Sequence, residues 1–377
     1  MQYYPINKPR IQLKNNIEIK NIFFIGKKYD GYLMEVGIKR FNRNIFYKFF
    51  SSKNLSALSD KKDFFSSFLS KKNDGVSVVF SELFENSAYN FIEAAKDIKQ
   101  IDKNIIFCLI TSEQSYVNSF FLEPKEGVDY TFYYSGDIGV FCTILNFFED
   151  KLNYKFDDER IILVVEDKPF FYTRILNTLN FEVSKGRTRN ILARNYCEAE
   201  DIILKCPERL AAAILDLYFV KDGIYAQHSW DVLNTFEHKN IKIPIIFSSE
   251  DKNLISQIRQ DSRIFALNKA SLGFLKNIRV ILGKYGGFGP FIFRTPPPHE
   301  QDVAIASNLT TLMELIRVID GKILLNHAKD NHFSNWIWLQ GYKDLALKIR
   351  DIVSTDPEYI RKKILQAYQE FVHQKNK

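Results

Sequence analysis

Between residues 160 and 284 the chain alternates short apolar runs with amphipathic stretches. Continuous apolar runs of about five residues are typical of strands buried on both faces of a sheet, and apolar positions spaced three or four apart predict helices. The expected strands are 161–165, 181–183, 211–215, 243–247 and 263–267. The expected helices are 168–180, 196–205, 223–238, 251–260 and 272–282. This alternation predicts a parallel five-stranded sheet with helices on both faces.

The preceding part of the chain repeats the same rhythm more faintly. Apolar runs predict strands at 21–26, 76–80, 105–110 and 129–134, and helical spacing predicts helices at 89–100 and 137–153. Aligning the segment VVFSELF (78–84) with AAILDLYF (212–219) indicates two copies of one fold in tandem. The expected fold class is therefore α/β, with two flavodoxin-like, doubly wound parallel sheets of five strands each.

The pattern changes after residue 284. The Gly- and Pro-rich segment 284–300 predicts a linker or a small extended element. Helices are expected at 308–319, with Ser307 as N-cap, and then at 326–349 and 357–373. These observations predict domains at 1–155 and 156–284, followed by a linker and a helical region at 285–377.

Composition narrows the class of protein. The 377 residues are 46% hydrophobic and 26% charged, the balance of a globular protein, and no apolar run is long enough for a membrane-spanning helix. The amino terminus has no secretory pattern, and the four cysteines form no CxxC pair, so we expect a reduced, cytoplasmic protein. The net charge of +7 is spread along the chain and favours a solvated, Lys-rich surface. Nucleic-acid binding through the basic residues 361–363 is the alternative.

Carboxylates follow two of the predicted strands. Glu166 and Asp167 come after the first strand of the second sheet, and Asp216 comes after the third. Right-handed crossovers bring these strand ends to one edge of the sheet, where clustered oxygen ligands suit Mg²⁺. A carboxylate beside such a cation can attack a phosphoryl group. Ser249 and Lys269, which follow the fourth and fifth strands, are candidates to bind the phosphoryl oxygens.

This order of residues resembles the receiver domain of two-component response regulators, over about residues 160–284. The resemblance implies that Glu166, Asp167, Asp216 and the main-chain carbonyl of Tyr218 hold Mg²⁺. It also implies that Asp216 accepts a phosphoryl group from a histidine kinase or a phosphotransfer protein, assisted by the catalytic-site residues Ser249 and Lys269. No catalytic output domain is recognisable, so the expected protein is a regulator that acts through protein contacts, and not an enzyme.

The chain departs from the receiver pattern at three places. Phe219-Val220 stands where a Met-Pro pair often follows the phosphoacceptor. The aromatic residue expected three positions before the lysine is Ala266, although Phe265 adjoins it, and Ala270 replaces a common proline. The first module resembles a degenerate receiver, because Glu82 stands at the acceptor position and Gly26-Lys27-Lys28 replaces the acidic pair. It is interpreted as a packing or dimerisation module, with mimicry of a phosphorylated state by Glu82 as the alternative.

A longer resemblance covers nearly the whole chain. It is carried by FFEDKLN (147–153), LVVEDKPFFY (163–172), NYCEAEDI (195–202), YGGFGPFIFR (285–294) and LNHAKDNHFSNWIWLQGYKDLA (325–346). In this order the segments resemble the amino-terminal regulatory region of phosphoenolpyruvate-synthase-like proteins of Bacteroidetes-type bacteria, including an HFSxW motif at 332–336. The nucleotide-binding and phosphohistidine domains of those proteins are not recognisable within these 377 residues, so we expect no synthase activity from them. The alternatives to phosphorelay signalling are thus a non-phosphorylated scaffold, or a regulatory subunit of a phosphoenolpyruvate-utilising enzyme.

Two histidines invite a metal or phosphohistidine interpretation. His327 and His332 are five residues apart, which places them off a common helical face, and no third ligand is evident. A packing or capping role is preferred for both. An unknown output protein and a homodimer are the remaining expected partners, with no membrane association.

Overall fold

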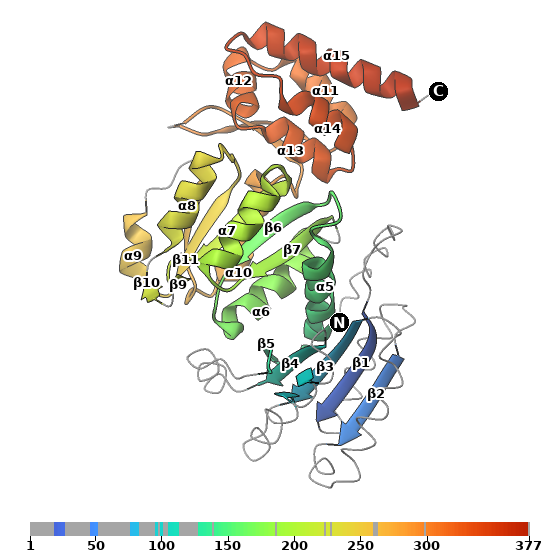
Figure 1. Cartoon of the computed structure of the whole chain (residues 1–377). Coiled ribbons are helices and arrows are strands. Elements are labelled where there is room, and N and C mark those ends of the chain that lie inside the picture. The colour runs from blue at the N-terminus through green and yellow to red at the C-terminus, as the bar shows by residue number, and fades with distance from the viewer. Residues whose placement is uncertain are drawn as a thin grey trace. The chain divides into compact units, whose positions relative to one another are not determined.

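A computed structural model describes residues 19–26, 46–51, 76–82, 95–96, 99–100, 105–112, 127–137, 139–184, 187–221, 224–226, 228–258, 263–297 and 299–375. The chain divides into two compact units. The first consists of 1–157 and 166–180, and the second of 158–165 and 181–377. Each unit is built on its own parallel sheet (Figure 1).

The sheet of the first unit has five parallel strands. They are β1 (Ile19–Gly26), β2 (Phe46–Ser51), β3 (Val76–Glu82), β4 (Ile106–Thr111) and β5 (Tyr130–Tyr133), in the order β2-β1-β3-β4-β5. The described side chains of β3 and β4 are almost all buried, as their apolar runs predict. Strand β2 was not located from the sequence, because its FYKFFS segment lacks a continuous aliphatic run.

Aromatic side chains hold the helices of the first unit against this sheet. The ring of Phe141, in α5 (Gly139–Asn153), meets Phe24 and Phe80 edge-on, at centroid distances of 6.4 and 6.3 Å. In α6 (Pro169–Thr178), Tyr172 donates a hydrogen bond to the carbonyl of Thr131 in β5. Helix α6 therefore packs with the first unit, although it follows the first strand of the second sheet along the chain.

The second sheet repeats the strand order of the first. Its strands are β6 (Arg160–Val165), β7 (Thr188–Ala193), β8 (Leu210–Asp216), β11 (Ile245–Ser249) and β12 (Ile264–Asn268), in the order β12-β11-β8-β6-β7. In chain order both sheets read 2-1-3-4-5, the order of flavodoxin-like folds. The helices of this part are α7 (Tyr196–Lys205), α8 (Ser229–His238), α9 (Lys252–Gln257) and α10 (Phe274–Tyr285). The prediction of an α/β fold with parallel sheets is confirmed.

Two local predictions in this region are wrong. The segment 181–183 is not a strand but part of a π-helical turn, Leu179–Ser184, and the second strand of the sheet lies at 188–193. That strand was obscured by Arg189, whose buried guanidinium lies 3.3 Å from Glu159 Oε2. The helix expected from residue 223 begins only at Ser229, because a hairpin of β9 (Phe219–Lys221) and β10 (Ile224–Ala226) precedes it.

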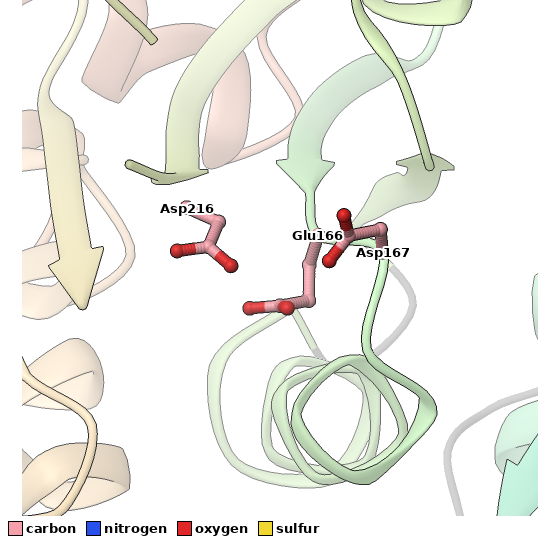
Figure 2. A group of neighbouring side chains, drawn as sticks. All are labelled: Glu166, Asp167 and Asp216. Carbon is pink, nitrogen blue, oxygen red and sulfur yellow. The ribbon is translucent and has the colours of Figure 1, made fainter. Parts of the chain in front are cut away.

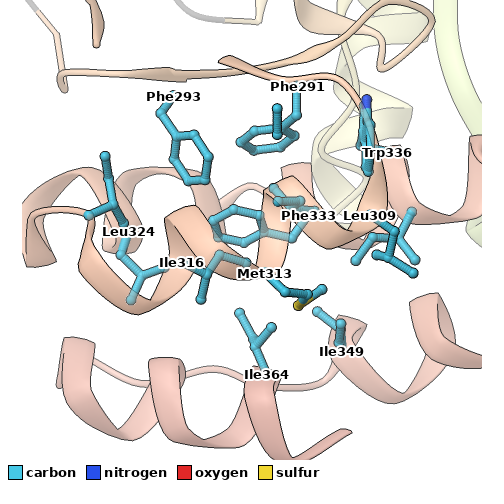
Figure 3. Close-up of a cluster of buried hydrophobic side chains, with 14 of the residues drawn as sticks. Phe291, Phe293, Leu309, Met313, Ile316, Leu324, Phe333, Trp336, Ile349 and Ile364 are labelled. Atoms are coloured by element: carbon cyan, nitrogen blue, oxygen red, sulfur yellow. The ribbon is translucent and has the colours of Figure 1, made fainter. Parts of the chain in front are cut away.

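The C-terminal region combines a hairpin with five helices in the described chain. Strands β13 (Phe291–Arg294) and β14 (Asp302–Ala306) pair antiparallel. The helices are α11 (Leu309–Val318), α12 (Gly321–Lys329), α13 (His332–Leu339), α14 (Lys343–Arg350) and α15 (Pro357–Lys375). One apolar core unites them, with Phe291 and Phe293 of the hairpin packed over Phe333 and Trp336 (Figure 3). We call this region the C-terminal bundle.

The bundle differs from its predicted outline at three places. Strand β14 was not expected. The N-cap of α11 is Asn308 rather than Ser307, because the Asn308 side chain accepts the Thr311 N–H at 2.9 Å. The single helix expected at 326–349 is broken at Asn331 and Gly341, whose φ angles of 57° and 90° lie in the left-handed region.

The bundle packs at the amino ends of the sheet strands. Arg160, at the start of β6, donates to the carbonyls of Glu208 and Leu210 and, at 2.7 Å, to Asn335 Oδ1 of α13. Its guanidinium lies 5.1 Å from the ring centroid of Trp338. Burial lowers the pKa of Arg160 to about 9. The second sheet and the C-terminal bundle thus belong to the same unit and are joined by the buried Arg160 side chain.

A glycine-rich joint connects α10 to the bundle. Gly286 N donates to Leu282 O at 2.9 Å, Gly289 N donates to Gly283 O at 3.1 Å, and Trp336 Nε1 donates to Gly289 O at 2.9 Å. A Cβ on Gly289 would lie 2.9 Å from Gly283 O, closer than a carbon can approach without displacing the backbone. The segment 284–300, expected as a linker or a small extended element, therefore contains this tightly packed joint and the extended strand Phe291–Arg294.

Two further properties concern the cysteines and the apolar character of the helices. All four cysteines are free thiols; Cys197 is exposed and the other three are buried. Among the described residues no helix has the length and apolar character needed to cross a membrane.

The joint predicts opposite effects for two glycine substitutions. Gly289→Ala should lower the free energy of unfolding by about 1–3 kcal/mol, because the added methyl group overpacks the joint. Gly283→Ala, inside α10 with open space around its Cβ, should raise it by about 0.5–1 kcal/mol through helix propensity. Urea unfolding of the two variants measures both values. Equal effects would contradict the tight packing of the joint.

Candidate functional site

The carboxyl ends of β6 and β8 bring three acidic side chains together. The two strands are parallel neighbours, with Val165 paired to Leu215, so the residues that follow them emerge side by side. One carboxylate oxygen from each of Glu166, Asp167 and Asp216 lies within 4.8 Å of the others (Figure 2). We call these three residues the acidic cluster. Their exposed fractions are only 1%, 8% and 4%.

Lys269 forms an ion pair with the acidic cluster. Lys269 Nζ lies 2.6 Å from Asp216 Oδ2, and both side chains are at most 5% exposed. Buried charges are costly unless they are paired, and Lys269 supplies one such partner to the cluster. Oxygen ligands of this kind are the ones that Mg²⁺ and other hard divalent cations prefer. The donor set therefore fits a divalent cation in charge and in chemistry.

Ser249 lies at the same edge of the sheet. It ends β11, next to β8 in the sheet, and Ser248 pairs with Asp216 in the register. The Ser249 hydroxyl accepts the Asp251 N–H at 3.1 Å, and its carbonyl accepts the Lys269 N–H at 2.8 Å. These bonds fix the turn into α9 and tie the ends of β11 and β12 together. The hydroxyl proton is left to be donated to another acceptor.

A hairpin that sequence analysis did not foresee follows Asp216. Tyr218, the expected carbonyl ligand, lies between β8 and β9, and its ring stacks on Tyr225 of β10 at a centroid distance of 6.0 Å. Lys221 pairs with Asp231 of α8 at 2.9 Å. The hairpin is thus bound to α8 by an ion pair, and Asp216 of the acidic cluster lies shortly before its first strand. A short apolar run interrupted by Lys221 and Asp222 was the only sequence signal for it.

The first sheet has no comparable group of acids at its strand ends among the residues that the structure describes. Only Glu166, Asp167 and Asp216 form a set of three potential metal-binding side chains among the residues that the structure describes. Glu82 ends β3, but its side chain lies outside the described residues, as do Lys27 and Lys28. Thr111 is buried at the end of β4.

His327 and His332 form a hydrogen-bonded pair inside the C-terminal bundle. His327 Nε2 accepts the backbone N–H of Arg294 at 2.9 Å, so its ring proton is on Nδ1. That proton faces His332 Nδ1 at 3.1 Å, which fixes the second tautomer with its proton on Nε2. Burial lowers the pKa of His327 well below its usual value and that of His332 to about 3. Both rings are therefore neutral, and both nitrogens of His327 are engaged in the fold.

The basic segment 361–363 contains a residue that already has a structural task. Arg361 donates to the carbonyls of Ile316 and Ile319 at the carboxyl end of α11, the latter at 2.8 Å. A cation at this position satisfies carbonyls that the helix leaves unbonded. Its guanidinium is thus used to dock α15 on α11, which weakens the case for a nucleic-acid site there.

Comparisons with known proteins do not identify a family for the chain. No protein-family model and no curated protein sequence matches the chain. The chain is weakly similar to tagatose-6-phosphate ketose/aldose isomerase from Escherichia coli, with 7% identity over 70% of this chain and 81% of that one, at a TM-score of 0.23. It is also weakly similar to a leucine-, isoleucine-, valine-, threonine- and alanine-binding protein from Brucella ovis in its closed conformation. That match has 10% identity over 92% of this chain and 82% of that one, at a TM-score of 0.21. Neither similarity bears on function.

The acidic cluster predicts stabilisation by Mg²⁺. At a concentration about 100 times its Kd, the cation should raise the free energy of unfolding by about 2.7 kcal/mol. Asp167→Asn should abolish most of this gain, and in EDTA it should be more stable than wild type because one like charge is removed. Thermal unfolding with and without Mg²⁺ measures both effects. Asp251→Asn, at an exposed position of the same sheet edge, is the control and should keep the full gain.

The histidine pair predicts a loss of stability in mild acid. The unfolded chain binds protons near pH 6.5 while the folded bundle does not, so stability falls as the pH drops from 6.5 towards 3. At about pH 5, His332 alone should cost about 2 kcal/mol relative to about pH 7.5. Urea unfolding at the two pH values should give a smaller difference for His332→Gln than for wild type. The exposed His373→Gln should behave as wild type, and an unchanged difference in His332→Gln would contradict the assignment.

Proposed function

We propose that the second sheet is a receiver-type signalling domain that accepts a phosphoryl group on Asp216. The observation that carries the proposal is the burial of three carboxylates with Lys269 at the carboxyl edge of a sheet of order 2-1-3-4-5. Ligand chemistry in open α/β sheets occurs at this edge. The tandem receiver organisation belongs to the same proposal, with the first unit as its degenerate member.

The reaction would be a substitution at phosphorus. A carboxylate oxygen of Asp216 forms a bond to phosphorus, the bond from phosphorus to the donor atom breaks, and the donor leaves with the electron pair. The product is an acyl phosphate with about two negative charges. Lys269, already 2.6 Å from Asp216, is positioned to pair with the new phosphoryl oxygens, and the Ser249 hydroxyl has a proton to donate to them.

Mg²⁺ fits this role through Glu166, Asp167 and Asp216, with the Tyr218 carbonyl as a further ligand. When bound, it would offset the negative charge that the carboxylates and the phosphoryl group bring together. Asp216 supplies the nucleophile, Ser249 the hydroxyl donor and Lys269 the ammonium group. The phosphoryl donor would be a histidine kinase, a phosphotransfer protein or a small acyl phosphate, and the output would be a protein contact.

The decisive experiment is intact mass spectrometry after incubation with Mg²⁺ and acetyl phosphate. Wild-type protein should gain the mass of one phosphoryl group and lose the gain when EDTA replaces Mg²⁺. Asp216→Asn should gain nothing, because an amide cannot form the acyl phosphate. Asp251→Asn is the matched control: the exposed side chain still caps α9 as an amide, and the variant should be phosphorylated as wild type.

The other outcomes separate the alternatives. If wild type refuses acetyl phosphate and every histidine kinase tested while it remains folded, the phosphorelay proposal fails and the scaffold interpretation stands. Co-purification of the unphosphorylated chain with a phosphoenolpyruvate-utilising enzyme would instead favour the regulatory-subunit alternative.

A further inference from the structure

We infer that the C-terminal bundle reports the state of the Asp216 site, through contacts that run from β12 along α10 to the His327–His332 pair. This inference rests on the proposed function and extends it by naming its output within the chain. The bundle packs at the amino ends of the strands, whereas the acidic cluster lies at their carboxyl ends. Any communication between them must therefore cross the length of the sheet.

Helix α10 spans that length. It begins at Phe274, shortly after Lys269, and ends at Tyr285, beside the bundle. Twelve residues of helix extend for about 18 Å. Its buried face, formed by Phe274, Ile278 and Leu282, anchors it within the second unit. A movement of the chain at Lys269 would thus be carried by one rigid element.

Contacts from the edge strand converge on the carboxyl end of α10. Among the described strands, β12 lies at the edge of the sheet and is hydrogen-bonded to β11 along one of its sides. Phe265 of β12 is 9% exposed, and its ring lies 4.6 Å from that of Tyr285, centroid to centroid. The Arg294 guanidinium lies over the same tyrosine ring, 4.0 Å from the Tyr285 centroid. Tyr285 therefore touches both the sheet and the first strand of the bundle.

Arg294 continues the contacts into the bundle. Its guanidinium donates to the Lys284 carbonyl at 2.6 Å, and its backbone N–H donates to His327 Nε2 at 2.9 Å. His327 in turn is bonded to His332, the first residue of α13. This series of contacts thus reaches the HFSxW segment, which contributes no residue to the Asp216 site.

The glycine joint makes this connection stiff. Trp336 donates to Gly289 O, and the backbone of Gly289 is bonded to Gly283 within α10. The joint has no room for a side chain at Gly286 or Gly289. A displacement of α10 therefore has to move α13 or to strain the joint, because little slack separates them.

Occupation of the site supplies the displacement. In the structure Lys269 is paired with Asp216 Oδ2, and its N–H is bonded to Ser249 at the end of β11. Phosphoryl transfer would give the Lys269 ammonium group new oxygens to bind. The end of β12, which directly precedes Lys269, would then shift with it. A typical coupling free energy between two sites changes an equilibrium by at least about five-fold.

Hydrogen–deuterium exchange on the full chain tests the inference. Amide protection in 321–339 should change by about five-fold or more after phosphorylation with acetyl phosphate and Mg²⁺. Tyr285→Leu, which removes both ring contacts, should be phosphorylated normally but lose this response. Tyr285→Phe keeps the ring and should retain it. Tyr342→Leu, which removes an aromatic ring elsewhere in the bundle, is the control and should respond as wild type.

Intact mass measured on the same samples separates the two proposals. If the mass of wild type rises and exchange in 321–339 does not change, the inference is overturned while the proposed function stands. The inference is also overturned if Tyr285→Leu is folded, phosphorylated and fully responsive. If no mass is gained from any donor, the proposed function fails, and this inference falls with it.

Discussion

The ion pair between Lys269 and Asp216 is the interaction on which the carboxyl edge of the second sheet depends. It joins the ends of β8 and β12 across β11, and it pairs a buried ammonium group with one of the three buried carboxylates of the acidic cluster. Buried ion pairs contribute little net stability, because desolvation offsets most of the Coulomb attraction. The Lys269–Asp216 pair is therefore not by itself a source of large net stability.

The opposite end of the sheet is built for stability. Arg160 is buried, but its guanidinium finds two carbonyls, an amide oxygen and the face of Trp338. The C-terminal bundle covers that end, and its core is a continuous set of apolar side chains from the hairpin and the helices. The second sheet thus has a charged edge at the carboxyl ends of its strands and a covered one at their amino ends, with α10 and the glycine joint running between them.

Helix α6 connects the edge to the rest of the chain in a different way. The chain leaves β6 through Glu166 and Asp167 and enters α6, which is held in the first unit by Tyr172 and by Thr173, whose hydroxyl accepts the Tyr133 N–H at 3.1 Å. The sequence order of strand and helix was predicted well. Which sheet the helix would pack against was not, because both sheets offer similar apolar surfaces and local periodicity does not distinguish them.

The sequence by itself determined the repeat of parallel strands, since apolar runs of this length need burial on both faces, and it determined which residues stand at the strand ends. The tertiary structure decided what depends on distant partners. Arg189 hides a strand because its buried charge is matched by Glu159, which no local pattern reveals. His327 and His332 meet because Asn331 turns the chain with a positive φ. The glycines of 286–289 are needed because Gly283 and Trp336 pack against them, a contact between segments that only folding brings together.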